Sequence, residues 1–190
     1  MKRIFAISDT HRLMIIPPSG YDMTIHLGDF IDYFDIGLAG EFAARYLRRF
    51  DEVREAYTHV VLGNHERMFL SRFGRAIISG EIPESMTIAV EQIRLRASHY
   101  LYLPRQGARE LPLVPEDLME NMYKEVIKHD ARLVLYGHTH HQRYDDYQGF
   151  HLVDTGYGQL GAAAEIIVDG RDVQVNLLPG LRENEEGERP

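Results

Sequence analysis

The sequence predicts an α/β domain in which the strands of a mixed sheet alternate with helices. Short apolar runs of the kind found in buried strands recur along the chain, and several intervals between them carry apolar residues at helical spacing. Toward the end of the chain, two further runs meet at an Asp-Gly pair, which is typical of a hairpin turn. Strands and helices that alternate and are then followed by paired strands indicate a layered α/β fold.

The expected strands are short and are bounded by turn residues or charges. They are predicted over 3–8, 23–29, 58–64, 93–99, 132–137 and 150–156, with a hairpin formed by 162–170 and 171–179. No internal repeat interrupts this order, so the runs are expected to form one continuous architecture.

Three segments are predicted to be helical. The first is 40–53, where Phe42, Tyr46 and Phe50 recur at helical spacing, and a second helix is predicted over 65–73. The third is 115–130, which opens with a proline and two acidic residues, as the N-terminus of a helix often does. The irregular stretch 101–115 before it is predicted to be a loop.

Composition narrows the classes of function. The 190 residues fit one domain, predicted over 1–180, and the acidic segment 181–190 is predicted to be a mobile tail. The net charge of -8 argues against nonspecific binding to nucleic acids, which requires a basic surface. No apolar run approaches the roughly 18 residues of a membrane span, and no signal peptide is visible, so the cytosol is the expected compartment. Since there is no cysteine, a bound metal must be held by His, Asp, Glu and Asn.

Five of the predicted strands end in polar side chains that a core would not accept. These ends read SDTH, HLGDFID, LGNHE, ASH and GHTH. Because the carboxyl ends of strands form the ligand crevice of open α/β sheets, we expect these side chains to converge. The oxygen and nitrogen donors among them are Asp9, His11, Asp29, Asn64, His99, His138 and His140.

Seven donors without sulfur suit two divalent ions that share one carboxylate. Imidazole and carboxylate ligands together favour manganese, with iron, zinc, nickel and cobalt as alternatives. Two ions about 4 Å apart stabilise the attacking and leaving oxygens of an in-line displacement, and they lower the pKa of a bound water. Cleavage of phosphate esters is the chemistry that most requires such a pair of ions.

Taken in order, SDTH, GDFID, GNHE, SH and GHTH resemble the motifs of the binuclear metallophosphoesterase (calcineurin-like phosphoesterase) superfamily. They extend from Asp9 to His140 and so cover most of the chain. The resemblance implies a layered β-sandwich with mixed sheets flanked by helices. It implies membership either of the small bacterial and archaeal phosphodiesterases or of the protein-phosphatase-like branch.

The resemblance also implies which metal each donor would hold. Asp9, His11 and His140 would hold the first ion, Asn64, His99 and His138 the second, and Asp29 would bridge the two. His99 rests on the shortest motif, and a surface histidine is the alternative for it. His141 has no place in the pattern and is expected to be a solvated loop residue.

In such enzymes a metal-bridging hydroxide attacks phosphorus in line, and the resemblance assigns the general acid to His65. A histidine near pKa 6.5 can pass a proton to a leaving alkoxide. Asp32 matches the carboxylate that orients this histidine in the phosphatase branch, with a turn or helix-cap residue as the alternative. Glu66 belongs to the motif but receives no chemical role.

Two features bear on whether the chain resembles the phosphodiesterases or the protein-phosphatase-like branch. Residues 154–156 read Asp-Thr-Gly, as in the phosphatase-like and diadenosine-tetraphosphatase-like enzymes, whereas the small phosphodiesterases carry Asn-Pro-Gly-Ser. Tyr33, however, stands where the phosphatase branch places an arginine that clamps phosphate. The candidate substitutes are Arg12, Arg67, Arg105 and Arg143. Three tyrosines near the site are expected to pack rather than to stack on a base: Tyr100, Tyr102 and Tyr157.

The predicted function is hydrolysis of phosphate monoesters or diesters, with nucleotides among the candidate substrates. Two other functions compete with it. Some relatives have lost catalysis and act as interaction scaffolds on the same fold, but the presence of His65 favours an enzyme. A nuclease is disfavoured by the acidic charge and by the lack of basic and aromatic clusters. The oligomeric state and the physiological substrate stay open.

Overall fold

The fold is described from a computed structural model, which places residues 1–32, 41–74, 81–100 and 130–180. The predicted loop over 101–115, the tail over 181–190 and, except for Asp130, the helix over 115–130 lie outside these ranges. The prediction of a single domain over 1–180 therefore stays a prediction.

The first sheet has five strands in the order β10-β9-β1-β2-β3. The strands are β1 (Lys2–Ile7), β2 (Met23–His26), β3 (His59–Val60), β9 (Ala163–Asp169) and β10 (Asp172–Leu178). The strands β1, β2 and β3 are parallel, whereas the hairpin of β9 and β10 runs antiparallel to β1. This hairpin turns at Gly170, the Asp-Gly turn that the sequence predicts.

The second sheet also has five strands, in the order β4-β5-β6-β8-β7. The strands are β4 (Ser85–Val90), β5 (Ile93–Ser98), β6 (Leu133–Tyr136), β7 (Arg143–Tyr147) and β8 (Phe150–Asp154). The three central strands are parallel, and β4 and β7 are antiparallel edge strands. Both sheets are therefore mixed.

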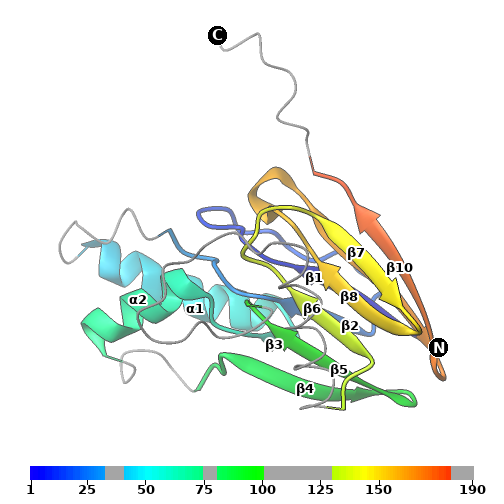
Figure 1. The fold of residues 1–190 in the computed structure, drawn as a ribbon. Helices are drawn as coiled ribbons and strands as arrows, with labels where there is room; N and C mark the ends of the chain where they lie inside the picture. Colours follow the sequence, from blue (N-terminus) through cyan, green and yellow to red (C-terminus); the bar gives the residue numbers. More distant parts are fainter. Residues whose placement is uncertain (33–40, 75–80, 101–129, 181–190) are drawn as a thin grey trace, which may run out of the picture.

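The two sheets stack face to face, and the helices lie at one side of the sandwich (Figure 1). Alternate residues of β1 separate two apolar clusters: Ile4 and Ala6 pack between the sheets, whereas Phe5 packs with the helices. The helices are α1 (Glu41–Ala56) and α2 (Asn64–Phe73), and a short 3-10 helix, η3 (Gly158–Leu160), follows β8. This arrangement confirms the layered sandwich of mixed sheets flanked by helices.

The structure corrects the predicted strands at two ends. Of the run 58–64, only His59–Val60 is strand, and α2 begins at Asn64. Gly63 caps that helix in extended conformation and donates its N–H to the Glu66 side chain. The candidate metal ligand Asn64 therefore lies at a helix N-terminus rather than at a strand end. The strand β2 ends at His26, three residues before Asp29. The edge strands β4 and β7 were not predicted.

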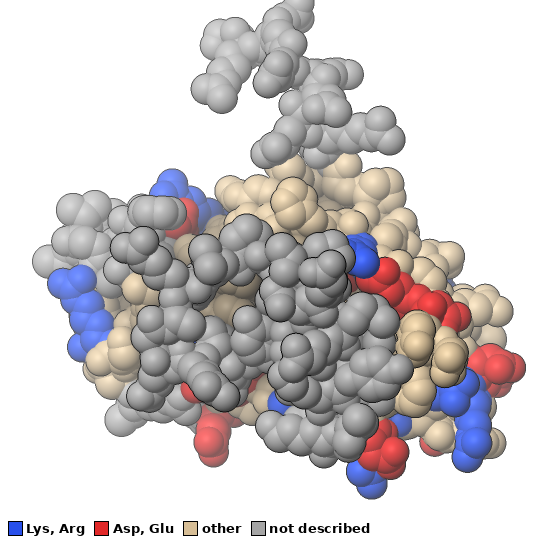
Figure 2. Space-filling view, viewed as in Figure 1, with Lys and Arg blue, Asp and Glu red and all other residues tan. Residues whose placement is uncertain are grey.

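The surface charges and the length of the helices can be described for part of the chain. On the face shown in Figure 2, basic and acidic side chains of the described residues lie next to one another. Among the helices that the structure describes, none is both long and apolar enough to cross a membrane.

Candidate metal centre

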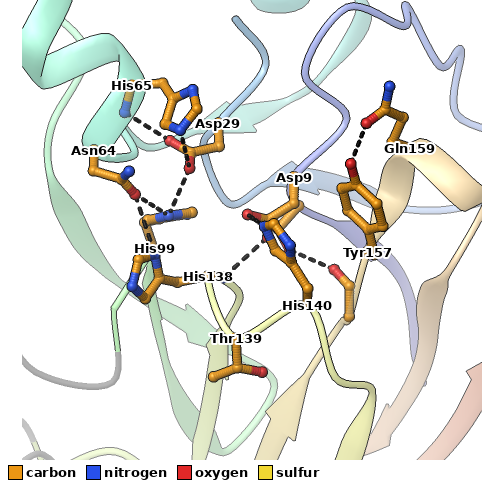
Figure 3. Close-up of polar contacts among 12 residues, drawn as sticks. Asp9, Asp29, Asn64, His65, His99, His138, Thr139, His140, Tyr157 and Gln159 are labelled. Carbon is orange, nitrogen blue, oxygen red and sulfur yellow. Dashed lines mark hydrogen bonds and ion pairs between the residues drawn. The ribbon is translucent and has the colours of Figure 1, made fainter. Parts of the chain in front are cut away.

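The seven donors converge on the segments that follow β1, β2, β3, β5 and β6, and Figure 3 labels all of them except His11. Main-chain hydrogen bonds continue the strand pairings into these loops. The N–H of Asp9 donates to the Gly28 carbonyl over 3.0 Å, and the N–H of Gly137 donates to the His99 carbonyl over 3.1 Å. The expected convergence of the polar strand ends is therefore realised by the topology of both sheets.

One group of donors consists of Asp9, His11 and His140, whose candidate ligand atoms all lie within 4.8 Å of one another. The carboxylate of Asp9 is fully buried, and its Oδ1 lies 3.2 Å from Nε2 of His140. The ring of Tyr157 stacks on His140 at 4.4 Å and meets His11 edge-on. The first group therefore has an aromatic wall on one side.

A second group consists of Asp29, His99 and His138, again within 4.8 Å of one another. The side-chain oxygen of Asn64 lies 2.9 Å from Nε2 of His99 and 3.1 Å from Nδ1 of His138 (Figure 3). Nδ1 of His99 lies 2.8 Å from the Leu27 carbonyl and donates to it, which leaves Nε2 directed at Asp29 Oδ2 over 3.2 Å. His99 is fully buried, so it is not a surface histidine.

His65 lies beside the second group, at the start of α2. Its main-chain N–H donates to Asp29 Oδ1 over 2.9 Å, and its ring Nε2 lies 3.9 Å from Asp29 Oδ2. His11, Asp32 and His65 form a third group within 4.8 Å. The carboxylate of Asp32 also accepts from Nε of Arg12 over 2.9 Å. The histidine and the carboxylate expected to orient it are thus close together.

The four arginines named as substitute clamps differ in position. Arg12 bonds Asp32 and so stands next to the third group. Arg67 pairs with Glu84 over 3.6 Å. Arg143 pairs with Asp145 on the edge strand β7, and Arg105 lies outside the described residues.

Two of the three tyrosines pack on the imidazoles of the cluster. Tyr100 is buried and meets the ring of His99 at 5.0 Å and that of His138 at 4.5 Å. Tyr157 stacks on His140 as described above, and its hydroxyl donates to the Gln159 side chain. Tyr102 lies outside the described residues.

Five of the donors have main-chain conformations that L-residues seldom adopt. The φ angles are 54° at Asp9, 47° at His11, 55° at Asp29, 73° at His138 and 59° at His140. Each such residue costs roughly 1–3 kcal/mol, and the conformation persists only where surrounding contacts fix it. Unusual backbone of this kind clusters at functional sites, and here it coincides with the candidate ligands.

Glu66, which belongs to the GNHE motif without an expected chemical role, supports the Asp29 loop. Its buried carboxylate accepts the main-chain N–H groups of Asp29, Ile31 and Gly63 at 2.7, 3.0 and 2.7 Å. Burial and the charge of Asp29 raise the pKa of Glu66 to about 8, and the three N–H donors oppose that rise. A side chain added at Gly63 would collide with Asp29 Oδ1, so only glycine allows this approach. Of these three contacts, the one with Gly63 could have been anticipated from the capping-box spacing of the two residues.

The charges of the cluster are strongly interdependent. Although burial opposes it, the carboxylates of Asp29 and Asp9 raise the pKa of His99 to about 10. The Asp9 carboxylate likewise raises the pKa of His140. Against the effect of burial, these imidazoles hold the pKa values of Asp9 and Asp29 below the ordinary range. Burial lowers the pKa of His11.

The donors fit divalent cations. Among the described residues, His11 Nδ1 is buried without a hydrogen-bond partner, and the buried Asp9 Oδ1 forms an ion pair with His140 but accepts no hydrogen bond. A buried polar atom left unpaired costs about 1–3 kcal/mol, which a bound ion would remove. Imidazole nitrogens with carboxylate and amide oxygens form the donor set that first-row transition metals prefer.

A sandwich of two mixed sheets with this cluster at its strand ends defines a protein of the metallophosphoesterase type. A model of the calcineurin-like phosphoesterase superfamily domain matches residues 1–165, and the chain belongs to that superfamily. Its members are mostly phosphoesterases that bind divalent metals, and this chain carries residue groups that could hold them. None of the curated proteins compared with it matches significantly.

Solved structures share the fold at low sequence identity. Vps29 of Chaetomium thermophilum is 17% identical, with a TM-score of 0.64 over 98% of this chain and 91% of that one. A predicted phosphoesterase of Streptococcus pneumoniae is 16% identical, with a TM-score of 0.57 over 93% and 88%. A protein of Thermotoga maritima is 23% identical, with a TM-score of 0.55 over 95% and 100%. These similarities show that the chain shares its fold with these three proteins.

Proposed function

We propose that this chain is a binuclear metal-dependent phosphoesterase that hydrolyses phosphate monoesters or diesters. The observation that carries the proposal is the meeting of two donor groups, one around Asp9 and one around Asp29, with His65 beside the second. Arg12 stands next to the third donor group, and its guanidinium suits an anionic substrate. Zinc is present in one fold relative, Vps29 of Entamoeba histolytica, which is 14% identical with a TM-score of 0.53.

Each group would hold one ion. We assign Asp9, His11 and His140 to the first ion, Asn64, His99 and His138 to the second, and Asp29 to both. When bound, such ions lower the pKa of a coordinated water and offset negative charge on a phosphoryl group. Manganese is the ion we expect, with iron, zinc, nickel and cobalt as alternatives.

The residues of the chain itself supply the proton and the orientation of the substrate. His65 is placed by its main-chain bond to Asp29, and we assign it the donation of a proton to the leaving oxygen. Asp32, whose carboxylate lies within 4.8 Å of the His65 ligand atom, would orient that ring. Arg12 is the candidate that would contact the phosphoryl oxygens, in place of the arginine missing at Tyr33.

The experiment that tests this function is turnover by the manganese-loaded protein of para-nitrophenyl phosphate against bis-para-nitrophenyl phosphate. A preference for the diester would favour cyclic or linked nucleotides as substrates. A preference for the monoester would favour the phosphatase branch.

The alternative is an interaction scaffold that binds metal but is catalytically weak. One fold relative, Vps29 of Chaetomium thermophilum, was solved with a cyclic peptide, at 18% identity and a TM-score of 0.61. If both ions are bound and neither ester is hydrolysed, the scaffold becomes the better description and the phosphoesterase proposal is rejected.

Metal binding should release protons at neutral pH. In the metal-free chain the pKa of His99, raised to about 10, keeps its ring protonated at neutral pH, and a nitrogen must lose its proton to bind a metal. The pKa of His140 is raised in the same direction. The apparent affinity for manganese should therefore increase as the pH rises toward the pKa of His99. Isothermal titration calorimetry in two buffers of different ionisation enthalpy measures the release, and an enthalpy independent of the buffer would contradict it.

A further inference from the structure

His26 is a buried histidine to which the proposed chemistry gives no role. It is the last residue of β2, and only 1% of its surface is exposed. Its ring lies between two segments that carry candidate ligands. Residues 9–11 follow β1, and residues 28–29 follow β2.

The hydrogen bonds of the His26 ring define its tautomer. The N–H of Gly28 donates to Nδ1 over 3.2 Å, so Nδ1 carries no proton. Nε2 therefore carries the proton of the neutral ring and donates it to the Thr10 hydroxyl, 3.0 Å away. The rings of Phe30 and Tyr57 meet the imidazole edge-on at 5.5 and 5.1 Å. Burial lowers the pKa of His26 to about 3, so the ring is neutral under ordinary conditions.

The two partners of His26 sit within the unusual backbone of the cluster. Thr10 lies between Asp9 and His11, which both have positive φ, and Gly28 has a φ of 96° and precedes Asp29. Two main-chain bonds already join these segments, from the Asp9 N–H to Gly28 and from the His11 N–H to Asp29. The ring of His26 adds a side-chain bridge between them.

We propose that His26 is a positioning residue, whose ring bonds Thr10 and Gly28 and thereby fixes the Asp9–His11 segment relative to Asp29. This inference rests on the proposed assignment of Asp9, His11 and Asp29 as ligands. Spacing between two ions that share Asp29 depends on the relative position of these segments. A loss of the bridge should therefore act first on the binuclear centre, before it acts on the fold as a whole.

The bridge has two arms: the first is the bond from the Gly28 N–H to Nδ1 of His26, and the second is the bond from Nε2 to the Thr10 hydroxyl. Four variants separate the contributions of these arms. His26→Asn keeps an acceptor near the position of Nδ1, and His26→Gln keeps a donor near the position of Nε2. His26→Phe keeps the ring shape and removes both bonds. Thr10→Val removes only the acceptor of the second arm, with little change in volume. A matched control is His151→Phe, because His151 is also a buried histidine but bonds Tyr144 in the second sheet.

The primary measurement is manganese titration of each variant, with the exchange-coupled signal of a manganese pair followed by electron paramagnetic resonance. We expect His26→Phe and Thr10→Val to weaken binding of the second ion by about 10–100-fold, as loss of ligand-supporting contacts does elsewhere. His26→Asn and His26→Gln should show smaller losses. His151→Phe should lower the melting temperature and leave the coupled signal unchanged.

A purely structural role would lower the melting temperature of His26→Phe and Thr10→Val without changing either metal affinity, and that result would overturn the inference. Long-range nitrogen NMR of the wild-type chain gives an independent check, since Nδ1 of His26 should show the shift of an unprotonated ring nitrogen. A protonated Nδ1 would also overturn it. Neither readout needs a substrate, so failure of turnover with both ions bound rejects the proposed function alone.

Discussion

Replacing Asp29 with asparagine should reduce the metal content of the chain from two ions to one and should abolish turnover. Oδ2 of the Asp29 carboxylate lies 3.2 Å from Nε2 of His99, and Oδ1 accepts the main-chain N–H of His65. An asparagine oxygen can still accept that N–H, so the start of α2 should be preserved. The negative charge that would attract and bridge two cations is lost, and a neutral amide is a poor bridging ligand.

Metal analysis of the purified variant after saturation with manganese and gel filtration measures this effect. The control is Asp172→Asn, the same change at an exposed carboxylate at the start of β10. This control should retain two ions and full turnover. Two ions per chain in Asp29→Asn would refute the bridging role and would move the shared ligand to another donor.

The location of the site was predictable because polar residues at the ends of apolar runs carry a strong signal. A strand that ends in SDTH or GHTH places donors where the core stops, and the topology of parallel strands brings such ends together. His99 shows the limit of this reasoning. Its short motif did not distinguish a ligand from a surface residue, whereas its burial between Leu27 and Asn64 depends on contacts 72 and 35 residues away.

The unpredicted strands β4 and β7 lie at the edges of the second sheet, where the sequence pattern is weakest. Residues 143–147 read RYDDY and are partly exposed on both faces, so they lack the alternation of a half-buried strand. Their turn places Gln148 and Gly149 at positive φ. The turn between β4 and β5 uses Glu91 at a φ of 51°, where glycine or asparagine is the usual signal.

The long-range hydrogen bonds that support the candidate ligands also could not be predicted from the sequence pattern. Thr10 and His26 are 16 residues apart, and Glu66 bonds the main chain of Asp29 across 37 residues. A buried histidine in an apolar run resembles any core histidine until both of its ring nitrogens are placed. The residues that fix the ligand backbone are therefore found only once the strands are assembled.

Replacing His65 with alanine should preserve both ions and reduce the turnover rate by roughly 10²–10⁴-fold, the usual contribution of a general acid. The main-chain N–H of this residue, which bonds Asp29, is unaffected by the change. The loss should depend on the leaving group. It should be largest for an alkyl phosphate ester, whose alkoxide needs a proton, and smaller for para-nitrophenyl phosphate, whose phenolate departs readily without one.

A series of aryl and alkyl phosphate esters, with leaving groups of increasing pKa, measures that dependence in the wild type and the variant. His141→Ala is the matched control, because His141 is an exposed histidine next to His140 and has no assigned role. The rate of this control should equal that of the wild type. If His65→Ala slows every ester by the same factor, proton donation is not its role, and the ring acts instead by stabilising charge on the phosphoryl oxygens. Unaltered turnover would remove His65 from the reaction altogether.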